Sequence, residues 1–176
     1  PSRSGSYNIS TSTIRTAFER TDADGLFNSD AFDQFERNIG IMAERLNDSR
    51  SDGELYDSIS QDVLIPAFLA AYTGKDASEN STSPLPRIPL PNWRLDFAGL
   101  SKIPALKKIF SSINLTHGYR SVYAVNNYVS NLSFTDLPIE LSNNLLSYPT
   151  AQLDTATNRL QPVYVINQVT LSEQFQ

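Results

Sequence analysis

The stretch PNWRLDFAGLSKIPALKKIFSSINLTHGYRSVYAVN, residues 91–126, decides the fold of this chain. It holds two segments, 93–97 and 113–126, in which apolar or aromatic side chains alternate with small or polar ones. Successive side chains of a β-strand point to opposite faces, so each segment predicts a strand with two faces of different character. The stretch therefore predicts a pair of neighbouring β-strands.

The second segment has the longer alternation. Its odd positions are Ile113, Leu115, His117, Tyr119, Ser121, Tyr123 and Val125, and its even positions are Asn114, Thr116, Gly118, Arg120, Val122, Ala124 and Asn126. About 9–11 residues of such alternation suffice to cross a bilayer as a tilted barrel strand. The same pattern is typical of a half-buried strand in a soluble sandwich, and periodicity alone does not separate the two.

Between these segments the apolar spacing becomes helical. Apolar residues recur at Leu100, Ile103, Leu106 and Ile109, and three lysines lie opposite them. The pattern predicts a short amphipathic turn over 100–110 that joins the paired strands.

Two helices are predicted before this stretch. Residues 30–47 carry Phe32, Phe35, Ile39, Met42 and Leu46 on one stripe, preceded by the capping candidates Asn28, Ser29 and Asp30. Residues 60–72 predict a second helix that ends before Gly74. Because proline is tolerated in the first helical turn, Pro66 predicts that this helix begins at or after Asp62.

The remaining chain predicts strands and connections. Residues 4–18 predict a strand with a change of phase at 11–13, and the four prolines of 76–91 predict an extended connector. After the long strand we expect a break at 126–127 and a further strand piece at 128–134. A polar connection follows at 136–159, with one helical turn at 139–146, and the chain ends in a strand at 160–171.

Composition excludes several classes of protein. The net charge is −5, with 19 acidic and 14 basic residues. The sequence lacks the basic stripe that is typical of a nucleic-acid-binding protein. The absence of cysteine excludes disulfides and thiolate metal sites. The sequence has no run of about 18 apolar residues, so it predicts no transmembrane helix. The mean hydropathy of −0.31 is still compatible with a β-barrel, because half of the residues in a barrel strand are polar. A start at Pro1, without Met or an apolar signal, predicts an excised or processed piece.

Three stretches carry a resemblance to a known family: YNISTSTIRTAF (7–18), SQDVLIPAFLAAYTGKDA (60–77) and PLPNWRLDFAGLSKIPALKKIFSSINLTHGYRSVYAV (89–125). They resemble the SprA/Sov family, the giant outer-membrane translocon of type IX secretion and gliding motility in Bacteroidetes. The resemblance implies a fragment from the later part of such a chain, without catalytic activity or cofactor. It further implies passage of folded proteins to the cell surface through a transmembrane β-barrel.

The implied fold is mainly β: antiparallel strands of a large transmembrane barrel with an α-helical extracellular insertion. Its expected parts are a barrel strand (1–20), a helical and Pro-rich loop insertion (21–91), a strand pair with a short periplasmic turn (92–134), a loop (135–159) and a barrel strand (160–176). Even the smallest such barrels have eight strands, so this chain cannot close one alone. The implied partners are the remainder of the translocon chain, secreted cargo, the cargo-shuttle barrel and plug proteins, and outer-membrane lipid.

On this interpretation the two faces of the strands have different roles. The candidate lumen-facing residues are Arg94, Asp96, Asn114, Thr116 and Arg120. The candidate lipid- or interface-facing residues are Trp93, Phe97, Ile113, Leu115, Tyr119, Tyr123 and Val125.

Two other functions stay open. A soluble cell-surface β-rich module could bind a glycan or a protein ligand, with Trp93, Tyr119, Tyr123 and Tyr128 lining a groove. A hydrolase could use scattered carboxylates, although the single histidine, His117, lies on the apolar side of its strand and favours packing. Ser58 and Thr155 each follow an aspartate and precede an apolar residue, a pattern similar to the O-glycosylation acceptor of Bacteroidetes.

Overall fold

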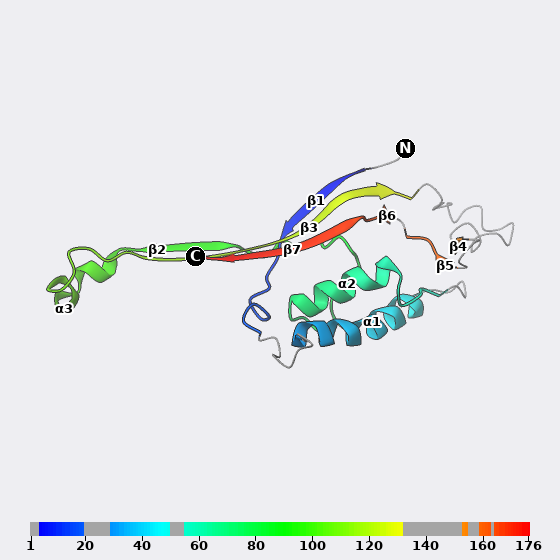
Figure 1. Ribbon diagram of the computed structural model, residues 1–176, viewed down its shortest axis with the longest axis horizontal. Coiled ribbons are helices and arrows are strands. Elements are labelled where there is room, and N and C mark those ends of the chain that lie inside the picture. The colour runs from blue at the N-terminus through cyan, green and yellow to red at the C-terminus, as the bar shows by residue number, and fades with distance from the viewer. Residues whose placement is uncertain (1–3, 20–28, 50–54, 132–152, 155–158, 163) are drawn as a thin grey trace.

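The computed structural model describes residues 4–19, 29–49, 55–131, 153–154, 159–162 and 164–176. A helical layer lies against one part of an antiparallel sheet, and a β-hairpin arm extends away from both (Figure 1). In chain order the elements are β1 (Ser4–Ser10), α1 (Asp30–Asp48), α2 (Gln61–Tyr72), β2 (Trp93–Phe97), the 3₁₀ helix η1 (Gly99–Lys102), α3 (Pro104–Lys107), β3 (Leu115–Ser130), β4 (Leu153–Asp154), β5 (Arg159–Leu160), β6 (Tyr164–Val165) and β7 (Gln168–Phe175).

The long strand β3 organises the sheet, because four other strands pair with it antiparallel. On one side it pairs with β2 through residues 115–119 and with β1 through 122–129. On the other side it pairs with β7 through 119–126 and with β6 at 129–130. Within the described residues the sheet is open, so the expected antiparallel sheet with a helical insertion is confirmed and a closed barrel is not shown.

Helix α1 matches its prediction closely. The side chain of Ser29 accepts a hydrogen bond from the Phe32 amide at 3.2 Å, and Asp30 and Asp33 lie in the first turn, where a helix favours negative charge. Met42 is fully buried on the predicted stripe, and the ring of Phe35 meets that of Phe68 edge-on at 6.4 Å. Phe32, which the pattern placed on the same stripe, is 45% exposed.

Helix α2 is the central layer of this part of the protein. One side, through Val63, Ala67 and Ala70, packs on Met42 of α1. The other side, through Ile65 and Leu69, packs on Tyr123 and Val125 of β3. A helix buried on both sides must be apolar around its whole circumference, which residues 63–72 of α2 satisfy.

The expected start of α2 is wrong. The helix begins at Gln61, so Pro66 lies in its second turn, where proline supplies no N–H for the Asp62 carbonyl. Burial of α2 between α1 and the sheet offsets this cost. The end of the helix is as predicted: Gly74 has φ of 61°, and the Lys75 amide donates to the Ala70 carbonyl at 2.9 Å, which forms a Schellman cap.

Asp62 gives the helical layer a testable pH dependence. Burial raises the pKa of its carboxyl from 3.8 to about 6, so the folded state holds this proton more tightly than the unfolded chain does. The protonated carboxyl therefore contributes to the free energy of unfolding. This contribution is fully present below about pH 4 and is lost as pH rises through about 6. The loss is at most about 3 kcal/mol, and the remaining solvent contact of the carboxyl reduces it. Urea denaturation at several pH values should show this loss in the parent and its removal in Asp62→Asn. Glu36→Gln, at an exposed position of α1, should lose stability with pH as the parent does. If Asp62→Asn showed the same dependence of stability on pH as the parent, Asp62 would not be its source.

Two predicted strand boundaries are wrong. Strand β1 ends at Ser10 instead of continuing to 18, because Thr13 turns inward to hydrogen-bond with Tyr119. Strand β3 is continuous across the predicted break at 126–127, but its pairing with β1 shifts register there, where Asn127 adopts a φ of 54°, a conformation that asparagine tolerates better than most residues.

The predicted final strand, 160–171, is divided in the structure. The Gln61 side chain donates to the Tyr164 carbonyl and accepts from the Ile166 amide at 3.3 Å, which occupies the backbone between β6 and β7. Strand β7 then extends beyond the predicted end to Phe175. The predicted helical turn at 139–146 lies outside the described residues, as does most of the connection at 136–159.

Candidate functional site

The arm formed by β2 and the start of β3 exposes one apolar face. The register pairs Trp93 with Tyr119, Leu95 with His117 and Phe97 with Leu115, so these side chains share a face of the ladder. Trp93, Leu95, Phe97 and Leu115 are 40%, 55%, 47% and 49% exposed. No helix covers this part of the sheet in Figure 1, in contrast to the part beside α2.

The opposite face of the arm is polar. The Arg94 side chain donates to Asp96 and forms an ion pair with it at 3.0 Å, and the Thr116 hydroxyl donates to the same carboxylate at 2.9 Å. Both charged side chains are about three-fifths exposed, so the pair contributes little to stability. Asn114 and Arg120 are exposed as well, so the structure leaves all five candidate lumen-facing residues at the surface.

The candidate lipid-facing residues fall into two groups. Trp93, Phe97 and Leu115 are exposed and Ile113 is half-buried. Tyr119, Tyr123 and Val125 are almost completely buried. For all three the expected outward position is corrected. Helix α2 covers Tyr123 and Val125, and Tyr119 lies against the rings of Trp93 and Phe175 and the amide of Thr13.

A row of aromatic rings marks the point where the covered and uncovered parts of this face meet. Tyr119 lies 4.6 Å from Trp93 and 5.1 Å from Phe175 between ring centroids. Phe175 in turn lies 5.1 Å from Phe18. Trp93 and Phe175 are partly exposed and Tyr119 is buried beneath them, so the row forms a border between the helical layer and the arm.

A polar junction lies on the helical side of this border. The Thr13 amide donates to the Tyr119 hydroxyl at 2.6 Å, and the Thr13 hydroxyl donates to Glu173 at 2.6 Å and lies 3.2 Å from the Ser121 hydroxyl. The junction joins the chain after β1 to both β3 and β7. Sequence analysis missed it, because Thr13 lies in a Ser- and Thr-rich stretch with no distinguishing spacing.

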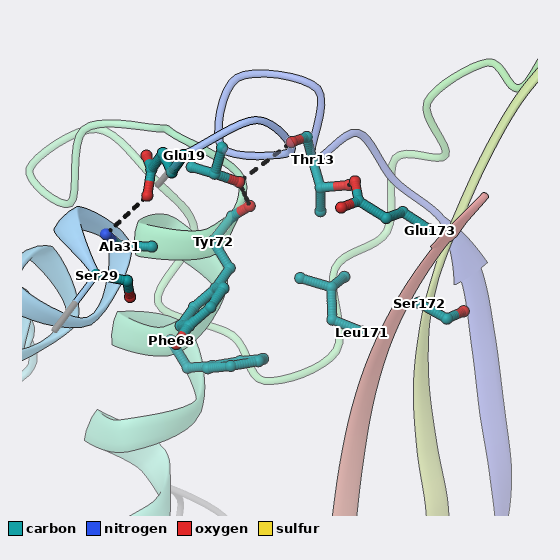
Figure 2. Close-up of a pocket in the computed structure, with 10 residues that line it drawn as sticks. Thr13, Glu19, Ser29, Ala31, Phe68, Tyr72, Leu171, Ser172 and Glu173 are labelled. Carbon is teal, nitrogen blue, oxygen red and sulfur yellow. Dashed lines mark hydrogen bonds between the residues drawn. The ribbon is translucent and has the colours of Figure 1, made fainter. Parts of the chain in front are cut away.

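Beside this junction is a cavity of about 290 Å³ (Figure 2). Phe68 and Tyr72 line its helical side and Leu171 its sheet side. Its two carboxylates are engaged by the chain itself: Glu173 accepts from Thr13, and Glu19 accepts from the Ala31 amide at 2.9 Å in the first turn of α1. The first contact belongs to the junction, and the second ties the chain after β1 to α1.

The residues that a hydrolase could use lie on different elements of the structure. His117 lies on the arm, 6.3 Å from the ring of Trp93. Asp48, Asp76 and Glu79 are exposed, and Asp52 and Glu54 lie outside the described residues. Within the described ranges, no group of three or more histidine or acidic side chains is arranged to hold a metal ion.

The four aromatics expected to line a glycan groove do not form one surface. Tyr123 is buried and donates to the Pro84 carbonyl at 3.0 Å, and Tyr128 meets Tyr164 edge-on at 5.5 Å. Of the two modification candidates, Ser58 is exposed and Thr155 lies outside the described residues.

No family model matches the chain. No curated protein matches it either. Among the helices that the structure describes, none combines the length and the apolar character needed to cross a membrane.

Proposed function

We propose that this chain is a wall segment of an outer-membrane protein translocon similar to SprA/Sov, which passes folded proteins to the cell surface. The observation that carries the proposal is the exposed apolar face of the arm, formed by Trp93, Leu95, Phe97 and Leu115. An exposed apolar face of this kind is typical of a surface that contacts lipid or another protein. The sequence resemblance favours lipid.

In this proposal the arm lies in the bilayer and the helical layer lies outside it, on the extracellular side. Trp93 and Phe175, which flank the buried Tyr119, then belong to the aromatic girdle at the interface, where such rings are enriched. The five paired residues of β2 span about 17 Å, less than the roughly 25 Å apolar band of a barrel wall. The exposed apolar residues at the tip of the arm supply the remainder.

The polar face fits the lining of an aqueous pore. It carries Arg94, Asp96, Thr116 and Arg120, and Gln174 pairs with Arg120 on β7. The open sides of β1, β2 and β7 would pair with further strands, since an unpaired edge in lipid leaves backbone groups unsatisfied at several kcal/mol each.

Inactivation of the gene tests the proposed function directly. Cells without the protein should retain folded cargo in the periplasm, measured by comparing the proteins of the periplasm, the cell surface and the medium. The parent gene and a His117→Gln version should both restore secretion, because no catalytic step depends on that side chain. Unchanged secretion in the inactivated strain would contradict the proposal, and failure of His117→Gln with normal assembly would favour an active site.

A soluble binding module is the alternative, supported by the same exposed aromatic side chains of the arm, chiefly Trp93. It differs in predicting that the chain remains in aqueous fractions after the cells are broken. Recovery with the outer membrane favours the translocon segment.

A further inference from the structure

The tip of the arm, residues 99–110, concentrates positive charge in an acidic chain. Three of the four lysines of the sequence, Lys102, Lys107 and Lys108, lie within these residues, and all three are exposed. Residues 97–131 contain no aspartate or glutamate, although the whole chain has a net charge of −5. The tip is therefore a local cationic site at the far end of the arm (Figure 1).

The same tip exposes large apolar side chains. Ile103, Ile109 and Phe110 are 43%, 74% and 49% exposed. The two short helices η1 and α3 bring these side chains and the lysines together: the Ile103 amide donates to the Leu100 carbonyl, and the Ile109 and Phe110 amides donate to that of Leu106. Lysines beside exposed apolar side chains are typical of segments that lie at a membrane interface.

We infer that the tip of the arm anchors in an anionic lipid surface, with the lysines at the headgroup phosphates and Ile103, Ile109 and Phe110 at the boundary of the acyl chains. Lysine suits this position because its long apolar stem lets the ammonium reach the headgroups while the stem stays among apolar groups. The charge selects an anionic surface, and the apolar side chains distinguish a bilayer from a free anion, which offers them no contact. The inference goes beyond the proposed translocon function and does not depend on it.

Vesicle flotation tests this anchor. The 176-residue chain should float with phosphatidylcholine vesicles that contain phosphatidylglycerol and remain behind with phosphatidylcholine alone. Each lysine near an anionic surface strengthens partitioning about fivefold, so Lys102→Gln/Lys107→Gln/Lys108→Gln should weaken it on the order of 100-fold. Ile109→Ser/Phe110→Ser should also weaken it, because the apolar contact with the acyl boundary is lost.

A matched variant separates the tip from net charge. Arg37→Gln/Lys75→Gln/Arg87→Gln removes the same charge from exposed positions elsewhere and should bind like the parent chain. Circular dichroism should show the same fold in all variants.

The opposite results overturn the inference. Equal flotation with neutral vesicles, undiminished binding of the tip variants, or an equal loss in the matched variant would exclude a cationic lipid anchor. Release by inorganic phosphate beyond that by sodium chloride at equal ionic strength would assign the lysines to a free anion instead. Secretion can still depend on the chain if vesicle binding fails, so the two proposals fail separately.

Discussion

Replacing Tyr123 with alanine is expected to lower the free energy of unfolding by about 3–5 kcal/mol, the range for truncation of a buried aromatic side chain. Tyr123 is fully buried, packs in one cluster with Ile65 and Leu69 of α2, and donates to the Pro84 carbonyl at 3.0 Å. Its loss therefore weakens the contact between the sheet, the central helix and the Pro-rich connector together. Urea or thermal denaturation of the purified chain measures the change.

Two further variants separate packing from hydrogen bonding. Tyr123→Phe keeps the ring and removes the hydroxyl, so it should cost about 1 kcal/mol. Val129→Ala, at a 43% exposed position of the same strand, should cost less than either. A loss below about 1 kcal/mol in Tyr123→Ala would mean that α2 does not cover this face of β3.

Replacing Leu115 with arginine is expected to block assembly in the outer membrane, at a cost of about 2–4 kcal/mol if the side chain lies near the middle of the bilayer. Leu115 pairs with Phe97 on the apolar face and is 49% exposed, so an aqueous arm would tolerate a charge there. The measurement is the amount of protein recovered in washed outer membranes, with the parent chain as reference.

Thr116→Arg is the matched control, one residue along the same strand. Thr116 lies on the polar face and donates to Asp96 at 2.9 Å, so an arginine there gains a carboxylate partner and should assemble normally. Equal recovery of the two variants would indicate that the arm has no lipid-facing side and would favour the soluble binding module.

Local patterns predicted the elements whose determinants lie close together in sequence. The stripe and the Ser29 cap located α1, Gly74 located the end of α2, and alternation located Trp93–Phe97. Strand limits were predicted less well: β1 ends early because Thr13 contacts Tyr119 across 106 residues, and no local pattern carries that information.

The candidate site shows the same limit. Alternation identified the two faces of β3 correctly, but it cannot tell which neighbour covers each part of a face. Tyr123 and Leu115 share the same parity, yet one lies under α2 and the other is exposed on the arm. The apolar circumference of α2 contained a signal, because a helix without a polar face must be buried on two sides.

The proposed function requires that the apolar face of the arm contacts lipid. Because the chain has no cysteine, a single introduced cysteine can carry a label that measures this contact directly. Single variants Leu115→Cys and Thr116→Cys, carrying an environment-sensitive fluorophore in native outer membranes, place a probe on either face of one strand. The label at 115 should be quenched by a lipid-soluble nitroxide and protected from aqueous iodide, and the label at 116 should behave in the opposite way. Equal quenching of both labels by iodide would contradict a lipid-facing arm.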